Sequence, residues 1–316
     1  MSLRAALFSS LLALSPAQPN DSCCNITAKG VLKTCAQCAL ISDWDQYTLN
    51  AMNITAIDVE AFNFPGGDKD LHMMGNLITT LPDGVFRNLK SARLVDLSWN
   101  AIEFLSDNVF QGLSSLTHLD LSVNRISSVS PLAFRSTPAL QTLHLENQFF
   151  PNYTPGDGWV LRNGTFSACA NLTDLTLFET ALRGVEVGAF KGLASLKSLD
   201  ISNGFPPNNL SPPFPDLSGS PALQYLDMNG VLCGGDPPSS TLPTNFLKGL
   251  AALDHLDLSG NACITTLPRA LFADQSPSLA PAISGDFNGN NCGGGLAVSC
   301  KACGVEVAKL NASCFS

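Results

Sequence analysis

The chain of 316 residues has little of what an enzyme or a membrane protein needs. After residue 17, no stretch approaches the roughly 18 to 20 consecutive apolar residues of a membrane-spanning helix. The sequence shows no nucleophile with a base at a usable spacing, no loop that would cradle a phosphate and no metal-binding motif. We therefore expect a protein without catalytic activity, cofactor, bound metal ion or membrane insertion.

Basic residues are also few, 17 against 26 acidic ones, so the formal net charge is -9. The first residues have the pattern of a secretory signal peptide, in which Arg4 precedes an apolar run from Ala5 to Leu14 and small residues follow. A buried first helix is the alternative, but the stretch SPAQPNDSCC breaks the pattern at once. We expect residues 1–17 to be removed and the mature chain, beginning near Gln18, to be secreted and extracellular.

One unit recurs along most of the sequence, and it is clearest in LTHLDLSVNRISSVSPLAFRSTPA, residues 116–139. Numbered from Leu116, it has apolar residues at positions 1, 4, 6, 11, 14 and 19 and Asn124 at position 9. The alternation of Leu119 and Leu121 predicts a short strand with one buried face, followed by an irregular return segment. One such unit cannot bury its apolar side chains alone, so units of this kind stack in arrays.

The array extends in both directions in steps that begin as 24 residues and then become less regular. Position 1 falls on Trp44, Asp68, Ala92, Leu116, Leu140, Leu172, Leu196, Leu223 and Leu253. Position 19 of the first four units is Phe62, Phe86, Phe110 and Phe134. Since the strand pattern persists in the later units, their extra residues are predicted to lie in the return segments, where loops tolerate insertions.

The segments LVDLSWNAI, LTHLDLSVNRI and LITTLPDGVFRNL resemble the strand and return motifs of the extracellular "typical" leucine-rich repeat family, over about Trp44 to Leu271. One L-x-x-L-x-L motif is weak evidence, but about nine in phase are strong evidence. The resemblance implies an α/β solenoid, a curved array with parallel strands on its concave face and a mostly irregular convex side. It also implies that partners bind most often on the concave face, without identifying the ligand.

Cysteines gather at both ends of the array, and the resemblance implies that disulfide-linked caps cover these ends. The two clusters are Cys23, Cys24, Cys35 and Cys38, and Cys292, Cys300, Cys303 and Cys314. Neither matches the family's standard cysteine spacing, so each cluster keeps three possible connectivities. A zinc or redox role for C-A-Q-C or C-K-A-C is less favoured, because no histidine lies near either pair.

The predicted domains are therefore a signal peptide (1–17), an N-terminal cap (18–43), a solenoid of about nine repeats (44–278) and a C-terminal cap (279–316).

Three cysteines lie within the array itself. Cys169 stands where other units have a core leucine, three residues after the phenylalanine position. Cys233 and Cys263 both occupy position 11, and equivalent positions of adjacent turns lie about 5 Å apart, so a bridge between them is feasible. A small buried thiol is the more common role, and we expect both to be free thiols.

The asparagine at position 9 recurs at Asn76, Asn100, Asn124 and Asn261. Its carboxamide can satisfy backbone groups where the chain bends out of the strand, since leaving such groups buried and unpaired costs about 1 to 3 kcal/mol each. We interpret this column as structural. Where Gln148, Thr180 or Gly204 replaces asparagine, the array is predicted to be locally irregular.

The outward strand positions are the predicted ligand-binding surface, and position 5 is rich in aspartate. The candidate residues are His72, Asp96, Trp99, His118, Asp120, His144, Asp174, Phe178, Asp200, Tyr225, Asp227, His255 and Asp257. One interpretation is that aspartate at position 5 belongs to the scaffold, because LDLS is itself typical of the family. The other is that stacked carboxylates make an acidic face that favours a cationic partner. A metal site along His72, Asp96, Asp120 and His144 is less favoured.

Asn-x-Ser/Thr sequons avoid these outward strand positions. They begin at Asn20, Asn25, Asn53, Asn152, Asn163, Asn171, Asn209 and Asn311. Sugars at these sites would cover the ends, margins and convex side and leave the concave face bare.

The sequence thus predicts a secreted repeat protein that binds an extracellular protein or peptide with a basic surface through its acidic concave face, as a soluble receptor-like or co-receptor module. A structural matrix component or adhesin with no single ligand is the alternative. We expect no nucleic-acid partner.

Overall fold

The computed structural model describes most of the predicted solenoid and part of the N-terminal cap. The described residues are 24–35, 46–63, 70–148, 158–180, 182–203, 214–233, 241–261, 263–264, 271 and 284–286. The predicted signal peptide, Cys23, Cys38 and the four C-terminal cysteines lie outside them. The chain divides into two compact units, Met1–Leu140 and Gln141–Ser316, which are described separately below.

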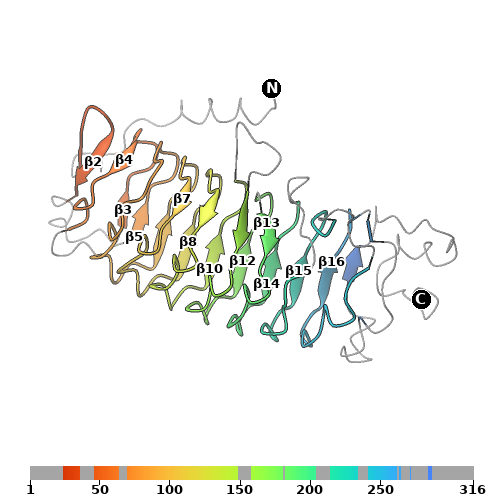
Figure 1. Ribbon diagram of the computed structural model, residues 1–316. Helices are drawn as coiled ribbons and strands as arrows, with labels where there is room; N and C mark the ends of the chain where they lie inside the picture. The colour runs from red at the N-terminus through yellow and green to blue at the C-terminus, as the bar shows by residue number, and fades with distance from the viewer. Residues whose placement is uncertain are drawn as a thin grey trace, which may run out of the picture. The chain divides into compact units, whose positions relative to one another are not determined.

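The first unit contains a sheet of parallel strands, each supplied by one predicted repeat. These strands are β3 (Gln46–Thr48), β5 (Asp70–His72), β6 (Leu94–Asp96) and β8 (His118–Asp120). Neighbours pair without any shift, so that Val95 lies opposite Leu119 and Asp96 opposite Asp120. The four strands follow one another along the first unit (Figure 1). In each strand the middle residue is buried and its two flanking residues are partly or fully exposed.

The second unit repeats this arrangement with longer returns. Its strands are β10 (Thr142–His144), β12 (Asp174–Thr176), β14 (Ser198–Asp200), β15 (Tyr225–Asp227), β16 (His255–Asp257) and β17 (Ser284–Asp286). All are parallel and in register. Strand β17 lies inside the range assigned above to the C-terminal cap and was not predicted from the sequence. The parallel-strand solenoid is confirmed in both units.

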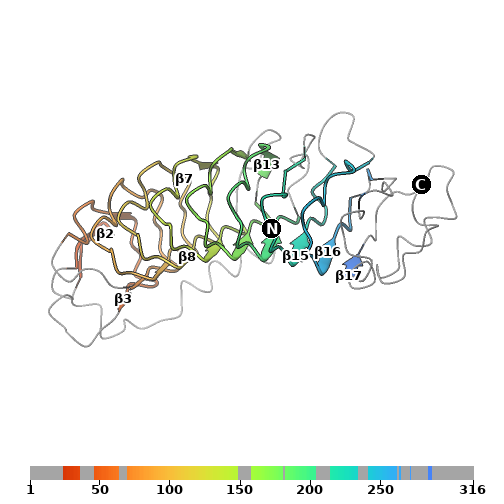
Figure 2. The ribbon, with the colours of Figure 1, turned by 90° about the horizontal axis from the view of Figure 1, so that it is seen from below.

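The return segments are turns and short strands, and the described residues include no α-helix. In the first unit β7 (Phe104–Leu105) pairs in parallel with β9 (Ser128–Val129), and in the second β11 (Trp159–Leu161) pairs with β13 (Leu182–Val185). Figure 2 shows β7 and β13 on the side opposite the main strands of their own units. No helix long and apolar enough to span a bilayer occurs in the described parts of the chain.

A small sheet covers the start of the first unit. Strand β1 (Asn25–Ile26) runs antiparallel to β2 (Val31–Thr34), and β2 pairs in parallel with β4 (Ala56–Ile57). A disulfide joins Cys24 to Cys35, two of the four cysteines predicted to pair within the N-terminal cluster. This covalent link closes the β1–β2 hairpin over the end of the apolar core.

The phenylalanine position forms a continuous column inside the first unit. Phe62, Phe86, Phe110 and Phe134 are fully buried. Successive ring centroids lie 6.3, 6.3 and 5.6 Å apart with the ring planes inclined by at most 24°. Each buried aromatic ring removes a large apolar area from water, so truncating one to alanine typically costs about 3 to 5 kcal/mol. The in-phase phenylalanines therefore hold successive turns together.

The asparagine position joins adjacent turns by hydrogen bonds, as predicted. Asn124 Oδ1 accepts from the backbone N–H of Ile102 in the preceding turn, and Asn124 Nδ2 donates to the carbonyls of Leu97 and Leu121. Asn76, Asn100 and Asn261 make the same kind of bridge. All four are buried, and the column is therefore structural.

The expectation for Cys233 and Cys263 was wrong. Their sulfurs form a disulfide, with the two Cα atoms 5.5 Å apart. Stacking of equivalent positions brings the two residues within the range that a disulfide spans, so regular packing of the turns is sufficient to place them. Cys169, in contrast, is buried at the leucine position of its turn, as expected.

Candidate functional site

The predicted binding surface corresponds to the side chains at positions 3, 5, 7 and 8 of each turn, which we call the strand face. Positions 3 and 5 are partly or fully exposed, whereas the serines at position 7 (Ser98, Ser122, Ser202 and Ser259) are buried. In the first unit His72 lies beside Asp96, and Asp96 beside Asp120, on adjacent parallel strands. In the second unit Asp200, Asp227 and Asp257 follow one another in the same way. Because side chains in register on neighbouring strands are about 5 Å apart, each unit has its own column of carboxylates.

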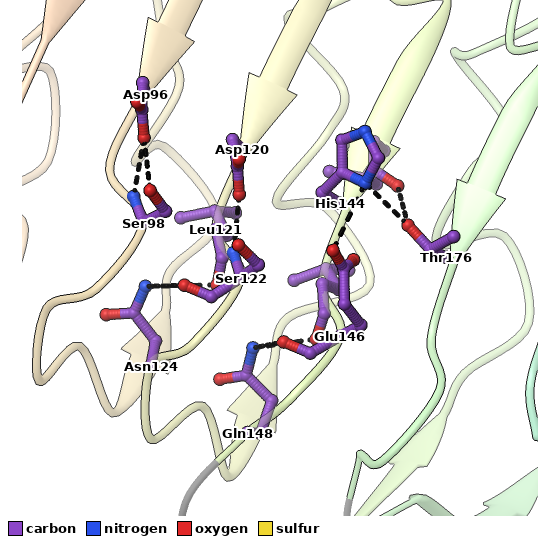
Figure 3. Close-up of polar contacts among 12 residues, drawn as sticks. Asp96, Ser98, Asp120, Leu121, Ser122, Asn124, His144, Glu146, Gln148 and Thr176 are labelled. Atoms are coloured by element: carbon purple, nitrogen blue, oxygen red, sulfur yellow. Dashed lines mark hydrogen bonds and ion pairs between the residues drawn. The ribbon is translucent and has the colours of Figure 1, made fainter. Parts of the chain in front are cut away.

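One oxygen of each position-5 aspartate supports the backbone. Asp96 Oδ1 accepts from the backbone N–H and the hydroxyl of Ser98, and Asp120 Oδ1 accepts from the N–H of Ser122 (Figure 3). The same bond to the N–H two residues on occurs at Asp200, Asp227 and Asp257, at 2.9, 2.9 and 2.7 Å. The scaffold role weighed for these residues is therefore present. Their role in ligand binding stays a prediction.

Position 8, where the chain leaves each strand, has left-handed backbone. Six residues that are not glycine share a φ between 51° and 57° there: Ala51, Trp99, Val123, Asn147, Glu179 and Asn203. Other turns have Gly75, Gly230 and Gly260 at this position, and all three also have positive φ. This conformation places the half-buried Trp99 indole at the edge of the first unit's strand face. The left-handed backbone at position 8 was not predicted from the sequence. The glycines at this position in three turns could have indicated it.

In the first turn of the second unit, position 5 is histidine instead of aspartate, and this histidine contacts a glutamate and a threonine. At position 5 His144 Nδ1 lies 2.9 Å from Thr176 Oγ1 and 3.4 Å from Glu146 Oε1 (Figure 3). Burial raises the pKa of Glu146, but hydrogen bonds with His144, its own N–H and Thr176 outweigh that effect and lower it. Sequence reasoning selected His144 and missed Glu146, although glutamate occupies a position where Ser98, Ser122, Ser202 and Ser259 stand in other turns.

Four candidates of the second unit, Tyr225, Asp227, His255 and Asp257, lie on β15 and β16. The rings of Tyr225 and His255 stack with centroids 4.4 Å apart and planes inclined by 3°. Burial, followed by repulsion from Asp200 and Asp257, raises the pKa of Asp227 to about 6. Burial and the charge of Asp227 raise the pKa of Tyr225 to about 12, so its hydroxyl stays protonated at neutral pH.

Three other candidates stand apart from these groups. His118 Nδ1 lies 2.8 Å from the hydroxyl of Thr117, and Asp174 accepts a hydrogen bond from Thr173 at 2.6 Å. Phe178 is half-buried at position 7 of its turn. Within the described ranges, no three histidine, cysteine, aspartate or glutamate side chains are arranged to hold a metal ion.

Four of the predicted sequons fall in the described residues, and their asparagines are all exposed. These are Asn25, Asn53, Asn163 and Asn171. None belongs to the strand face. Their glycosylation, and that of the four sequons outside the described residues, stays a prediction.

Parallel strands of three residues, one strand per turn, with a buried asparagine after each strand, define a repeat protein of the solenoid class. The family model described as "Leucine rich repeat" matches residues 92–148, and that described as "BspA type Leucine rich repeat region (6 copies)" matches residues 159–207. The chain belongs to the leucine-rich repeat family.

Solved structures with the same fold have low sequence identity to this chain. A chain of the octameric complex of Latrophilin 3, Unc5D and FLRT2 (LRR) aligns with a TM-score of 0.63 and 20% identity over 89% of this chain and 85% of that chain. Toll in the Drosophila Toll–Spatzle complex aligns with a TM-score of 0.56 and 20% identity over 74% of this chain. A chain of the TLR13–ssRNA13 complex aligns with a TM-score of 0.55 and 21% identity over 78% of this chain. The chain spans only 28% and 36% of those two proteins. No curated protein sequence matches it.

Proposed function

We propose that this chain is a secreted leucine-rich repeat protein of the extracellular "typical" subtype that binds an extracellular protein or peptide through the strand face. It acts as a soluble receptor-like or co-receptor module and has no catalytic step. The domain order given above is part of the proposal, and so are the signal peptide and the glycosylated margins.

The repeated aspartate at position 5 carries this proposal. Asp96 and Asp120 in the first unit, and three aspartates in the second, all point outward from rigid, regularly paired strands. In the bonds described above, each uses one carboxylate oxygen to accept from the backbone, and each side chain remains partly exposed on the strand face. Such a face attracts a basic partner and steers its approach.

Relatives in fold support a macromolecular partner. Toll is solved in a complex with Spatzle, and FLRT2 (LRR) in a complex with Latrophilin 3 and Unc5D, which supports a protein partner for this chain. TLR13 is solved with single-stranded RNA. An acidic face repels the phosphates of RNA, and we therefore retain a protein or peptide as the proposed partner.

The test removes charge without removing the scaffold bond. Asp96→Asn with Asp120→Asn keeps an oxygen to accept the N–H of Ser98 and Ser122, so folding is retained. Affinity for a partner isolated with the wild-type chain should fall about tenfold, and Trp99→Ala should also weaken binding. Surface plasmon resonance at low and high salt measures both.

A matched control changes the same charge elsewhere on the first unit. Asp83 and Asp107 accept hydrogen bonds from the hydroxyls of Ser106 and Ser130 on the return side. Asp83→Asn with Asp107→Asn should bind like wild type. If the Asp96 and Asp120 pair and Trp99→Ala also bind like wild type, the strand face is not the site, and the matrix or adhesin role is favoured.

A further inference from the structure

The two stacked rings on β15 and β16 form a flat aromatic surface on the second unit's strand face. Tyr225 and His255 are directly in register, and both are half-exposed. Position 3 of the neighbouring described strands holds Ser198, Asp174 and Thr142, so the second unit has no other pair of adjacent rings at this position in its described strands. Half-exposed aromatic rings of this kind are the side chains that anchor binding partners most often.

Carboxylates surround this aromatic pair. Asp227 follows Tyr225 on β15, with Asp227 Oδ2 3.4 Å from the tyrosine hydroxyl and Asp227 Oδ1 bound to the N–H of Asn229. Asp200 on β14 and Asp257 on β16 flank it in register. Among the described residues, no lysine, arginine or histidine forms an ion pair with any of the three aspartates.

This arrangement is electrostatically unfavourable in the unliganded chain. Burial first, and then repulsion from Asp200 and Asp257, raise the pKa of Asp227 to about 6, although hydrogen bonds from Asn229 and Tyr225 act in the opposite direction. A cation placed between the carboxylates would remove that repulsion. The aromatic faces beside them favour the same charge, because the negative face of a ring attracts a cation within about 6 Å.

We propose that Tyr225, His255 and Asp227 form the seat for an arginine side chain of the partner. The planar guanidinium stacks on the aromatic pair and donates to the carboxylate of Asp227, a combination that the compact ammonium of lysine matches less well. This inference rests on the proposed function, since it names the residue that the partner contributes to the second unit's strand face. The titratable groups beside Asp227 are Tyr225 on its own strand, Asp200 on β14 and Asp257 on β16. His255 on β16 is in register with Tyr225.

The experiment uses the full secreted chain and three synthetic peptides of equal length, rich in arginine, lysine or citrulline. Citrulline keeps the planar shape of arginine and lacks its charge. The arginine peptide should bind several-fold more tightly than the lysine peptide, and the citrulline peptide should not bind measurably. Because protonation removes the charge of Asp227, arginine-peptide binding should weaken by about tenfold between about pH 7.5 and about pH 5.

Three variants locate the seat. Tyr225→Leu and Asp227→Asn should each weaken arginine-peptide binding by roughly tenfold. Tyr225→Phe keeps the ring and should bind within about twofold of wild type, which separates lost aromatic contact from damage to the fold. The return-side pair Asp83→Asn with Asp107→Asn is the control for net charge.

The outcomes separate this inference from the proposed function. Loss of binding in Asp96→Asn with Asp120→Asn, with normal binding in Tyr225→Leu and Asp227→Asn, would overturn the arginine seat and leave the proposed function standing. Normal binding in all of these variants would overturn both. Equal affinity for arginine and lysine peptides, together with normal binding by Tyr225→Leu, would show diffuse attraction and overturn the seat.

Discussion

The carboxamide oxygen of Asn124 accepts a hydrogen bond from the backbone N–H of Ile102, 3.0 Å away and one turn earlier in the chain. The same side chain donates to the carbonyls of Leu97, Leu121 and Ser122, and it is 1% exposed. One residue thus satisfies buried polar groups of two successive turns. A substitution there leaves those groups without partners in the apolar core.

Asn124→Leu should therefore lower the free energy of unfolding by about 2 to 3 kcal/mol, because the backbone groups that it pairs stay buried. Urea denaturation followed by circular dichroism measures the change. Ser127→Ala, at an exposed position of the same turn, is the control and should change stability by less than about 0.5 kcal/mol. A similarly small effect of Asn124→Leu would show that the column is not structural.

The disulfide between Cys233 and Cys263 closes a loop with a sequence separation of 30 residues. Replacing both cysteines with serine should lower stability by about 3 to 4 kcal/mol, because the unfolded chain regains the freedom that the bridge restricts. Mass mapping of the non-reduced protein should identify one peptide containing both residues. Alkylation of both thiols without a reductant would contradict this pairing.

The core columns were predictable because every turn stacks on an equivalent neighbour. The positions of Phe110 and Asn124 follow from their spacing alone, since a residue inward in one turn is inward in the next. The Cys233–Cys263 bridge depends instead on two thiols facing each other across one particular contact. The sequence spacing allows this pairing, but a cysteine at such a position is more often a buried free thiol. The packing of the two turns is what decides between these alternatives.

The candidate surface was predictable to a lesser degree. Alternation along each strand identifies Asp96 and Asp227 as outward, but their different environments depend on what adjacent strands place beside them. Asp227 is flanked by two carboxylates and an aromatic pair, whereas Glu146 is bound by His144 and Thr176. The repeat alignment identifies which residues are neighbours on adjacent strands, but the burial and hydrogen bonds of each side chain depend on the packed structure.

Asp227→Asn should stabilise the chain at neutral pH. The pKa of Asp227 is raised from 3.8 to about 6 on folding, so between these values the folded chain binds more protons than the unfolded chain. The free energy of unfolding therefore falls as pH rises through this window. Above the window, the full destabilisation by the ionised Asp227 is present. The carboxylate is partly exposed and screened by solvent, so the gain in the variant should be about 1 kcal/mol near pH 7.5, less than the full shift implies.

The gain should disappear below about pH 3, where the aspartate is protonated in both states. Urea denaturation at both pH values measures it. Asp216→Asn is a control in the same unit, because hydrogen bonds from the Ser218 hydroxyl and N–H lower the pKa of Asp216. That change should give no gain at neutral pH. A loss of stability in Asp227→Asn at neutral pH would contradict the electrostatic account.

Replacing Val123 should stabilise the protein, because the φ of Val123 is 52°, which is unfavourable for a β-branched residue. Left-handed backbone costs about 1 to 2 kcal/mol for most residues, whereas asparagine adopts it more readily. Asn147 and Asn203 occupy the same position of other turns. Val123→Asn should therefore raise the free energy of unfolding by about 1 kcal/mol, measured by urea denaturation.

The reverse change, Asn203→Val, is the matched experiment in the second unit and should lower stability by a similar amount. Opposite signs for the two changes would show that the backbone at position 8, rather than local packing of one side chain, sets the cost. If both changes are neutral, the left-handed conformation is not strained. Opposite signs would mean that Val123 destabilises the fold at this position. Backbone strain is often found at functional sites, so Val123→Asn should then also be tested for partner binding.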